Sequence, residues 1–136
     1  MVWVRSELMM KPKVMRKLQD KIRAAFREID LWTSGSCIKY LGLMIKETFK
    51  LYPATTILIT RGSSEACEIN GYVIPAKTRV IINSWAIMRD PQYWEDAEEF
   101  RPERFANGIS KAGVSGDVPP FFPFGWGQRT CVGQNF

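Results

Sequence analysis

A cysteine near the carboxyl end of the chain, Cys131, lies in a segment whose residues suit a thiolate metal ligand. Its neighbours complete the pattern Phe-x-x-Gly-x-Arg-x-Cys-x-Gly through Phe124, Gly127, Arg129 and Gly133. A thiolate stays deprotonated when backbone N–H groups and the positive end of a helix are nearby. We expect a helix to begin directly after Cys131 and to direct its N-terminus at the sulfur. The segment therefore predicts a loop that presents one thiolate to a metal.

The other residues of this loop fit a haem iron. Gly127 and Gly133 lack a Cβ atom, so the backbone can turn sharply and approach a flat macrocycle. Arg129 can form charge-assisted hydrogen bonds with a haem propionate, and Phe124 can shield the sulfur from water. A single Cys thiolate on haem iron favours splitting of the O–O bond. The plain alternative is a buried structural cysteine, but the five matched positions favour the ligand.

The other cysteines favour no second metal site. The chain has three cysteines, Cys37, Cys67 and Cys131, and no histidine. Without a Cys-x-x-Cys pair or a histidine, neither a zinc site nor a disulfide framework is expected. A redox sensor at Cys131 is a weaker alternative, because it needs a resolving cysteine and neither of the others is near in sequence.

Helices dominate the elements that must position these residues. Residues 3–10 are helix-compatible, and an apolar stripe every four residues predicts an amphipathic helix over 12–29. The stripe consists of Val14, Leu18, Ile22 and Phe26. A second helix, marked by Ile38, Leu41, Ile45 and Phe49, should end at Tyr52-Pro53. On this helix Glu47 and Lys50 share a face, and the spacing alone favours a weak exposed ion pair.

A small β-sheet completes the predicted fold class, which is mainly α. Strands are expected at 56–60, 72–74 and 79–82, with a turn at 69–72 between two strands. Asn83 is expected to cap a short helix that runs to Met88. Residues 106–119 are rich in Gly and Ser and predict a surface loop.

Three motifs in this order resemble the cytochrome P450 family. Besides the cysteine loop, Glu47-Thr48-Phe49-Lys50 resembles the family's Glu-x-x-Arg helix, and residues 100–105 match its Pro-Glu-Arg-Phe element. Residues 71–105 are similar to plant microsomal members that oxidise terpenoids and alkaloids. The resemblance covers essentially residues 1–136. It implies a partial cytochrome P450 domain with proximal-side helices, a small sheet and the cysteine-ligand loop, as a carboxy-terminal segment of a longer protein.

The resemblance implies a role for each site residue. Cys131 would be the axial ligand of haem b, and Arg129 would hold a propionate. Arg61 would hold a propionate too, or it is an exposed loop arginine, which is the default for arginine. Phe124, Gly127 and Gly133 would shape the thiolate loop, and residues 54–59 would contact substrate.

The resemblance also implies a buried structural clamp of Glu47, Lys50 and Arg104, with Trp94 and Phe105 packed beneath it. Lys50 departs from the family pattern, which has arginine. Arginine donates hydrogen bonds from a planar fork, whereas lysine is a point charge on a flexible stem. Since a hydrogen bond to a charged group is worth about 1.5–3 kcal/mol, we expect weaker packing around the haem than an arginine would give.

The implied activity is monooxygenation, in which one oxygen atom of O2 enters an apolar small molecule such as a terpenoid or alkaloid. NADPH–cytochrome P450 reductase would supply the electrons. The longer protein would be anchored in the endoplasmic reticulum membrane and face the cytoplasm, with the oxygen-activating helix upstream of this segment. The isolated segment is therefore expected to have little activity. The alternative is an inactive, truncated remnant that binds haem weakly or binds only a partner.

Composition excludes other classes of function. The net charge is +5, and no Lys/Arg run alternates with aromatic residues as a nucleic-acid groove would need. Residues 12–29 carry many of the basic side chains, which predicts a solvated helix face. No apolar run approaches the roughly 18 residues that a spanning helix requires, so no membrane anchor is expected in this segment.

Overall fold

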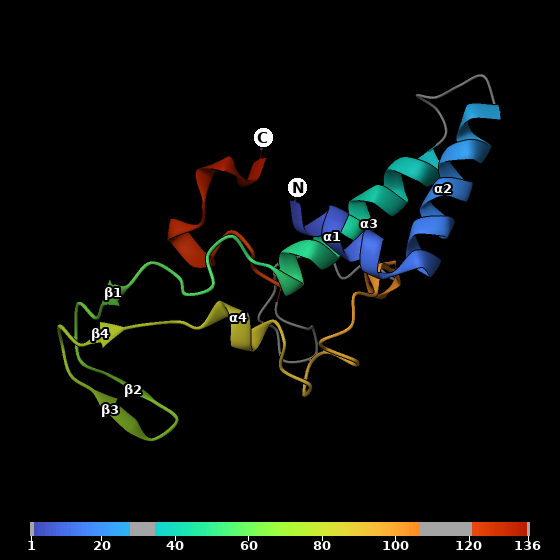
Figure 1. The fold of residues 1–136 in the computed structure, drawn as a ribbon. Helices are drawn as coiled ribbons and strands as arrows, with labels where there is room; N and C mark the ends of the chain where they lie inside the picture. Colours follow the sequence, from blue (N-terminus) through green and yellow to red (C-terminus); the bar gives the residue numbers. More distant parts are fainter. Residues whose placement is uncertain (1, 28–34, 107–120, 136) are drawn as a thin grey trace.

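The structure, a computed structural model, describes residues 2–27, 35–106 and 121–135. Helices dominate it, as predicted (Figure 1). The α-helices are α1 (Val2–Met10), α2 (Pro12–Arg27), α3 (Gly35–Leu51) and the short α4 (Ser84–Ile87). The 3-10 helices are η1 (Pro102–Phe105), η2 (Gly127–Arg129) and η3 (Val132–Asn135). Within these ranges no helix is long and apolar enough to cross a membrane.

Helix α2 confirms the predicted amphipathic stripe. Pro12 is its first residue, where proline costs no hydrogen bond. Leu18 is buried in the core, and Val14 and Ile22 pack against the same cluster. The side chain of Phe26 lies outside the described part of the chain, as do residues 28–34.

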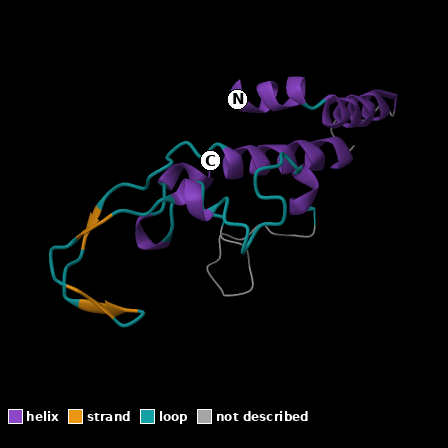
Figure 2. Ribbon diagram, turned by 60° about the horizontal axis from the view of Figure 1, so that its bottom comes forward, coloured by secondary structure: helices purple, strands orange, loops and turns teal. Residues whose placement is uncertain are grey.

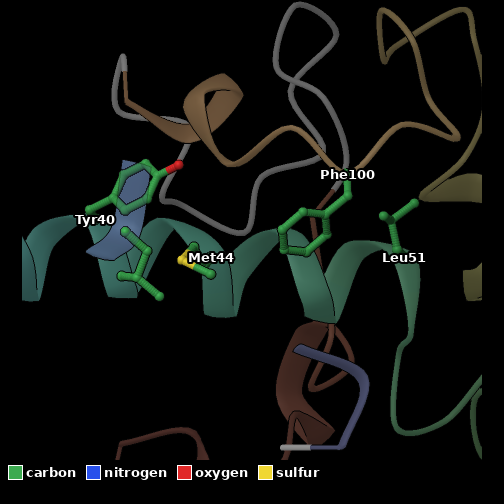
Figure 3. Close-up of a cluster of buried hydrophobic side chains, with 5 residues drawn as sticks. Tyr40, Met44, Leu51 and Phe100 are labelled. Atoms are coloured by element: carbon green, nitrogen blue, oxygen red, sulfur yellow. The ribbon is translucent and has the colours of Figure 1, made fainter. Parts of the chain in front are cut away.

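Helix α3 is the central element and packs against α1, α2 and η1. The helix ends at Leu51, as predicted, but its buried face differs from the expected stripe. Ile38 and Leu41 are exposed. The core is formed instead by Tyr40, Met44 and Leu51, with Phe100 packed against them (Figure 3). These three positions are four and seven residues apart, so they too share one side of the helix.

The β structure forms two separate antiparallel ribbons and not one sheet (Figure 2). Strand β1 (Arg61–Gly62) pairs with β4 (Arg79–Val80), and β2 (Cys67–Ile69) pairs with β3 (Tyr72–Ile74). The predicted strand at 56–60 is wrong, because Ile57 forms only an isolated bridge with Asn83. The turn between β2 and β3 is confirmed: Asn70 and Gly71 have φ values of 50° and 82°, as a tight hairpin requires.

The short helix α4 begins as predicted. The Asn83 side chain accepts a hydrogen bond from the Ala86 N–H at 3.0 Å, and Met88 caps the C-terminal end. Met88 is fully buried in a second core cluster with Trp94, Ala97, Phe105 and Phe121. The loop predicted at 106–119 lies outside the described residues, except for Ala106.

Candidate functional site

The cysteine loop is closed by its own backbone. The Cys131 N–H donates to the Phe124 carbonyl at 2.9 Å, and the Gly125 N–H donates to the Phe122 carbonyl at 3.0 Å. Gly125 and Gly127 have φ values of +83° and +81°, which residues with a Cβ rarely adopt. The turn expected at Gly127 is therefore confirmed. Gly125 was not among the expected residues, although the Gly-Trp-Gly spacing was a signal for a second turn.

Gly133 lies in the 3-10 helix η3 (Val132–Asn135). It is not among the described glycines with positive φ, and the close approach to a macrocycle expected there stays a prediction. A Cβ at this position would lie 3.6 Å from the Cys131 sulfur. Gly133 thus keeps the backbone bare beside the thiol. The helix expected after Cys131 is only the 3-10 helix η3.

Two aromatic contacts join this loop to the core. The rings of Phe124 and Phe49, on α3, meet edge to face with centroids 5.3 Å apart. At the start of the loop, the rings of Phe121 and Phe105 meet at 5.0 Å. The loop is therefore supported from α3 and from η1, while the Cys131 side chain is exposed.

The structure brings Arg61 to the cysteine loop. Its Nη2 atom lies 3.5 Å from the Arg129 carbonyl oxygen, across 68 positions of sequence. Arg129 is exposed, and Arg61 is partly buried. The Arg61 guanidinium thus reaches the backbone of the cysteine loop two residues before Cys131, and arginine side chains here would suit an anionic group that carries carboxylates.

The donor set fits a haem. Within residues 2–27, 35–106 and 121–135, no group of three or more Cys, Asp or Glu side chains can surround a metal ion. A metal held through Cys131 would therefore bring most of its own ligands, as haem iron does. Haem also requires an accessible thiol, a backbone that allows close approach and cations for its propionates. The chain offers Cys131, Gly133, and Arg61 with Arg129 for these three needs.

The Glu47–Arg104 pair of the clamp is formed. Glu47 is fully buried and accepts a hydrogen bond from the Arg101 backbone N–H at 3.0 Å. The Nε atom of Arg104 lies 3.2 Å from one Glu47 oxygen and 3.1 Å from the other. Burial raises the pKa of the Glu47 carboxyl, and the Arg101 N–H and the Arg104 charge oppose that rise. The guanidinium also donates to carbonyls of residues 95, 96 and 99.

Lys50 is also fully buried, so the exposed ion pair with Glu47 that the helix spacing favoured is wrong. Its Nζ donates to the Ala97 carbonyl at 2.5 Å and lies 5.2 Å from the centroid of the Trp94 ring. Burial lowers the pKa of Lys50 to about 8. Trp94 and Phe105 pack beside the clamp, as expected.

The segment expected to contact substrate, residues 54–59, is mostly exposed, with Ile59 at 77%. Ser84, which the sequence analysis missed, holds this segment in place. Its buried hydroxyl is 2.8 Å from the Thr55 carbonyl and 2.9 Å from the Thr56 carbonyl. Its place directly after the predicted cap, Asn83, was the available signal.

Known proteins resemble the chain along its whole length. The sequence profile of the cytochrome P450 family matches residues 1–136. The chain is 44% identical to 5-epiaristolochene 1,3-dihydroxylase of Nicotiana tabacum, over 99% of the chain and 27% of that protein. It is 43% identical to tabersonine 16-hydroxylase 1 of Catharanthus roseus, over 98% of the chain and 26% of that protein.

Solved structures agree. A zebra fish cytochrome P450 solved with abiraterone superposes with a TM-score of 0.76 and 27% identity, over 98% of this chain and 31% of that one. The chain thus spans about a quarter of the length of these curated relatives. With the closed Cys131 loop and the buried Glu47–Arg104 pair, these matches show that the chain belongs to the cytochrome P450 family.

Proposed function

We propose that this chain is part of a haem-thiolate monooxygenase that binds haem b through Cys131. The observation that carries the proposal is the exposed thiol in a glycine-turned loop, next to the contact between Arg61 and Arg129. When bound, the haem supplies the activation of O2, and one oxygen atom enters the substrate. Members of the family are haem-thiolate proteins.

In this proposal the chain's own residues bind the haem and orient it. Cys131 supplies the thiolate, and the loop closed by the Phe124 carbonyl fixes where its sulfur lies. Arg61 and Arg129 would bind the propionates through charge-assisted hydrogen bonds, which are stronger than neutral ones. Phe124, whose ring packs against Phe49 of α3, would limit the access of water to the sulfur. Gly133 leaves room beside the sulfur.

Glu47, Lys50 and Arg104 do not touch the haem in this proposal. They tie α3 to residues 95–104, and Phe105, which follows this segment, packs against the start of the cysteine loop. The clamp therefore supports the loop that carries Cys131 and does not contact the haem itself.

Substrate and partner follow from the relatives. Two of them are named as hydroxylases of 5-epiaristolochene and of tabersonine. We propose an apolar small molecule of the terpenoid or alkaloid class as substrate, with residues 54–59 among its contacts. NADPH–cytochrome P450 reductase would supply the electrons. The complete protein would lie at the cytoplasmic face of the endoplasmic reticulum membrane.

A second candidate is a chain that binds haem weakly without turnover. Lys50 favours this candidate. Its amine donates a hydrogen bond to one carbonyl, that of Ala97, whereas the arginine that the family has at this position offers several donors in a planar guanidinium. The two candidates differ in whether NADPH and reductase yield an oxidised product from the haem-loaded protein.

A haem titration tests the shared part of both candidates. Thiolate-ligated haem gives a red-shifted Soret band in the ferrous–CO form, and we expect this band from the purified chain. Cys131→Ser should abolish it. Cys67→Ser is the matched control, since Cys67 is also an exposed free thiol, and it should retain the band. A band that survives Cys131→Ser would remove Cys131 as the ligand.

A further inference from the structure

The clamp buries one more cation than its carboxylate can pair. Lys50 and Glu47 are fully buried, and the Arg104 side chain is 8% exposed. Arg104 pairs with the Glu47 carboxylate through its Nε atom, and the Arg101 N–H donates a hydrogen bond to one of the same carboxylate oxygens. Lys50 forms no ion pair within 4.0 Å in the described residues.

The contacts of Lys50 do not replace a carboxylate. Its Nζ donates to the Ala97 carbonyl and faces the Trp94 ring, with 5.2 Å to the centroid. The Arg104 guanidinium faces the same ring at 6.0 Å. Two cations thus contact one aromatic ring, which stabilises each less than a ring of its own would.

The remaining charges near Lys50 are already matched. Arg89, just after α4, and Glu98, in the segment that follows, pair with each other at 3.1 Å. The charged groups that face Lys50 are therefore Glu47 from α3, Arg104 from η1, and this second pair. Glu47 is paired with Arg104, and Glu98 is paired with Arg89. The ammonium of Lys50 therefore has no carboxylate of its own and is the surplus charge.

We propose that Lys50 is a proton-release switch in the support of the cysteine loop. By giving its proton to solvent it removes the surplus buried charge, and the neutral amine still donates to the Ala97 carbonyl. An arginine at this position stays charged and cannot do the same. Proton release from Lys50 does not require bound haem, because every contact of Lys50 lies within the chain.

The loop is coupled to this site by direct packing. Phe49, next to Lys50 on α3, contacts Phe124. Phe105, next to Arg104, contacts Phe121. The Trp94 ring that Lys50 faces also contacts Phe105, so a change in charge at Lys50 can reach the Cys131 loop through Trp94 and Phe105.

The direction of the pH effect follows from linkage. Burial lowers the pKa of Lys50 to about 8 in the fold, against 10.5 for an ordinary lysine. Between these values the unfolded chain binds more protons than the folded chain, so stability rises with pH. Below about pH 8 both states are protonated and the effect is absent.

The test is equilibrium unfolding of the 136-residue chain from pH 7 to 10.5, with Lys50→Arg and Lys50→Met as matched variants. Relative to both variants, the unfolding equilibrium constant of the wild type should fall by up to about tenfold per pH unit above pH 8. Tyrosines titrate in all three proteins, so their effect cancels. Parallel profiles for the wild type and either variant would overturn the proposal.

A direct measurement covers the case in which a variant does not fold. Lysines labelled with 13C at Cε report their own protonation by NMR. One resonance of the folded wild type should titrate well below the others and be absent from the spectrum of Lys50→Arg. If all lysines titrate together near their ordinary pKa, the proposal is wrong, whatever the haem titration shows.

Discussion

Lys50 stands where the family has arginine, and its surroundings show what the exchange changes. The Lys50 Nζ contacts only the Ala97 carbonyl and the Trp94 ring among the groups described around it. Arg104, by contrast, contacts three carbonyls and Glu47. A second fork would tie more of the 95–104 segment to α3. Compared with an arginine, Lys50 thus provides fewer hydrogen bonds and an amine that can lose its proton.

Replacing Lys50 with arginine should stabilise the chain at pH 7. The added donors are worth about 1.5–3 kcal/mol where they reach a carbonyl or carboxylate. We expect a higher free energy of unfolding by urea denaturation and slower loss of haem. The gain should shrink as the pH rises above 8, because burial lowers the pKa of Lys50 to about 8. Unchanged stability and haem retention would contradict the expected loss of packing.

Removing the clamp's carboxylate charge should be costly. Glu47→Gln leaves Arg104 and Lys50 buried without an anion, and breaking a buried pair costs about 3–5 kcal/mol. Asp20→Asn is the control, since the Asp20–Arg23 pair is exposed and such pairs contribute about 1 kcal/mol or less. Urea denaturation measures both changes, and equal effects would show that Glu47 is not a structural anion.

At the scale of elements, local side-chain bonds position segments that have little regular structure. Helix α4 has four residues, too few to be stable alone. It is held by the Asn83 cap, and Ser84 holds the neighbouring segment through the Thr55 and Thr56 carbonyls. These bonds fix residues 54–59, the proposed substrate contacts.

Asn83→Ala should destabilise the chain by about 1 kcal/mol, the usual cost of losing an N-cap. Asn83→Asp keeps an oxygen that can accept from the Ala86 N–H and should restore most of the loss. Thermal or urea denaturation compares the three proteins. If aspartate proves no better than alanine, the cap does not stabilise α4.

At the scale of the whole molecule, two clusters of buried side chains meet on α3. One lies between α3 and α2, and the other joins α4, η1 and the start of the cysteine loop. Leu43 packs against both. The β2–β3 ribbon extends away from the helices (Figure 1) and is exposed at all but one of its strand residues.

Hydrogen exchange should report this division. Amides in the buried part of α3, around Met44 and Lys50, should exchange slowest, and the paired amides of β2 and β3 should exchange much faster. The reason is that the ribbon buries little apolar surface, so it can open without unfolding the core. Equal protection of ribbon and helix would show that they unfold as one unit.

Much of the architecture was predictable from the sequence because it depends on local patterns. The period of apolar residues predicted α2 and α3, Asn83 predicted a cap, and Asn70-Gly71 predicted a turn. These signals act over a few residues, so no tertiary context is needed to interpret them. The spacing around Cys131 likewise predicted one loop with a turn at Gly127.

Tertiary structure decided which faces are buried and which distant residues meet. Periodicity favoured an exposed Glu47–Lys50 pair, but Arg104 pairs with Glu47 and the Trp94 ring lies against Lys50, and both residues of the pair are buried. The strand expected at 56–60 is reduced to a bridge, because strand formation requires a partner along its length. Arg61 reaches the Arg129 carbonyl across 68 positions, and no spacing rule predicts that contact. The sequence by itself determined the residue types and local turns, and the packing of α3 decided their surroundings, because burial and charge pairing depend on contacts between distant segments.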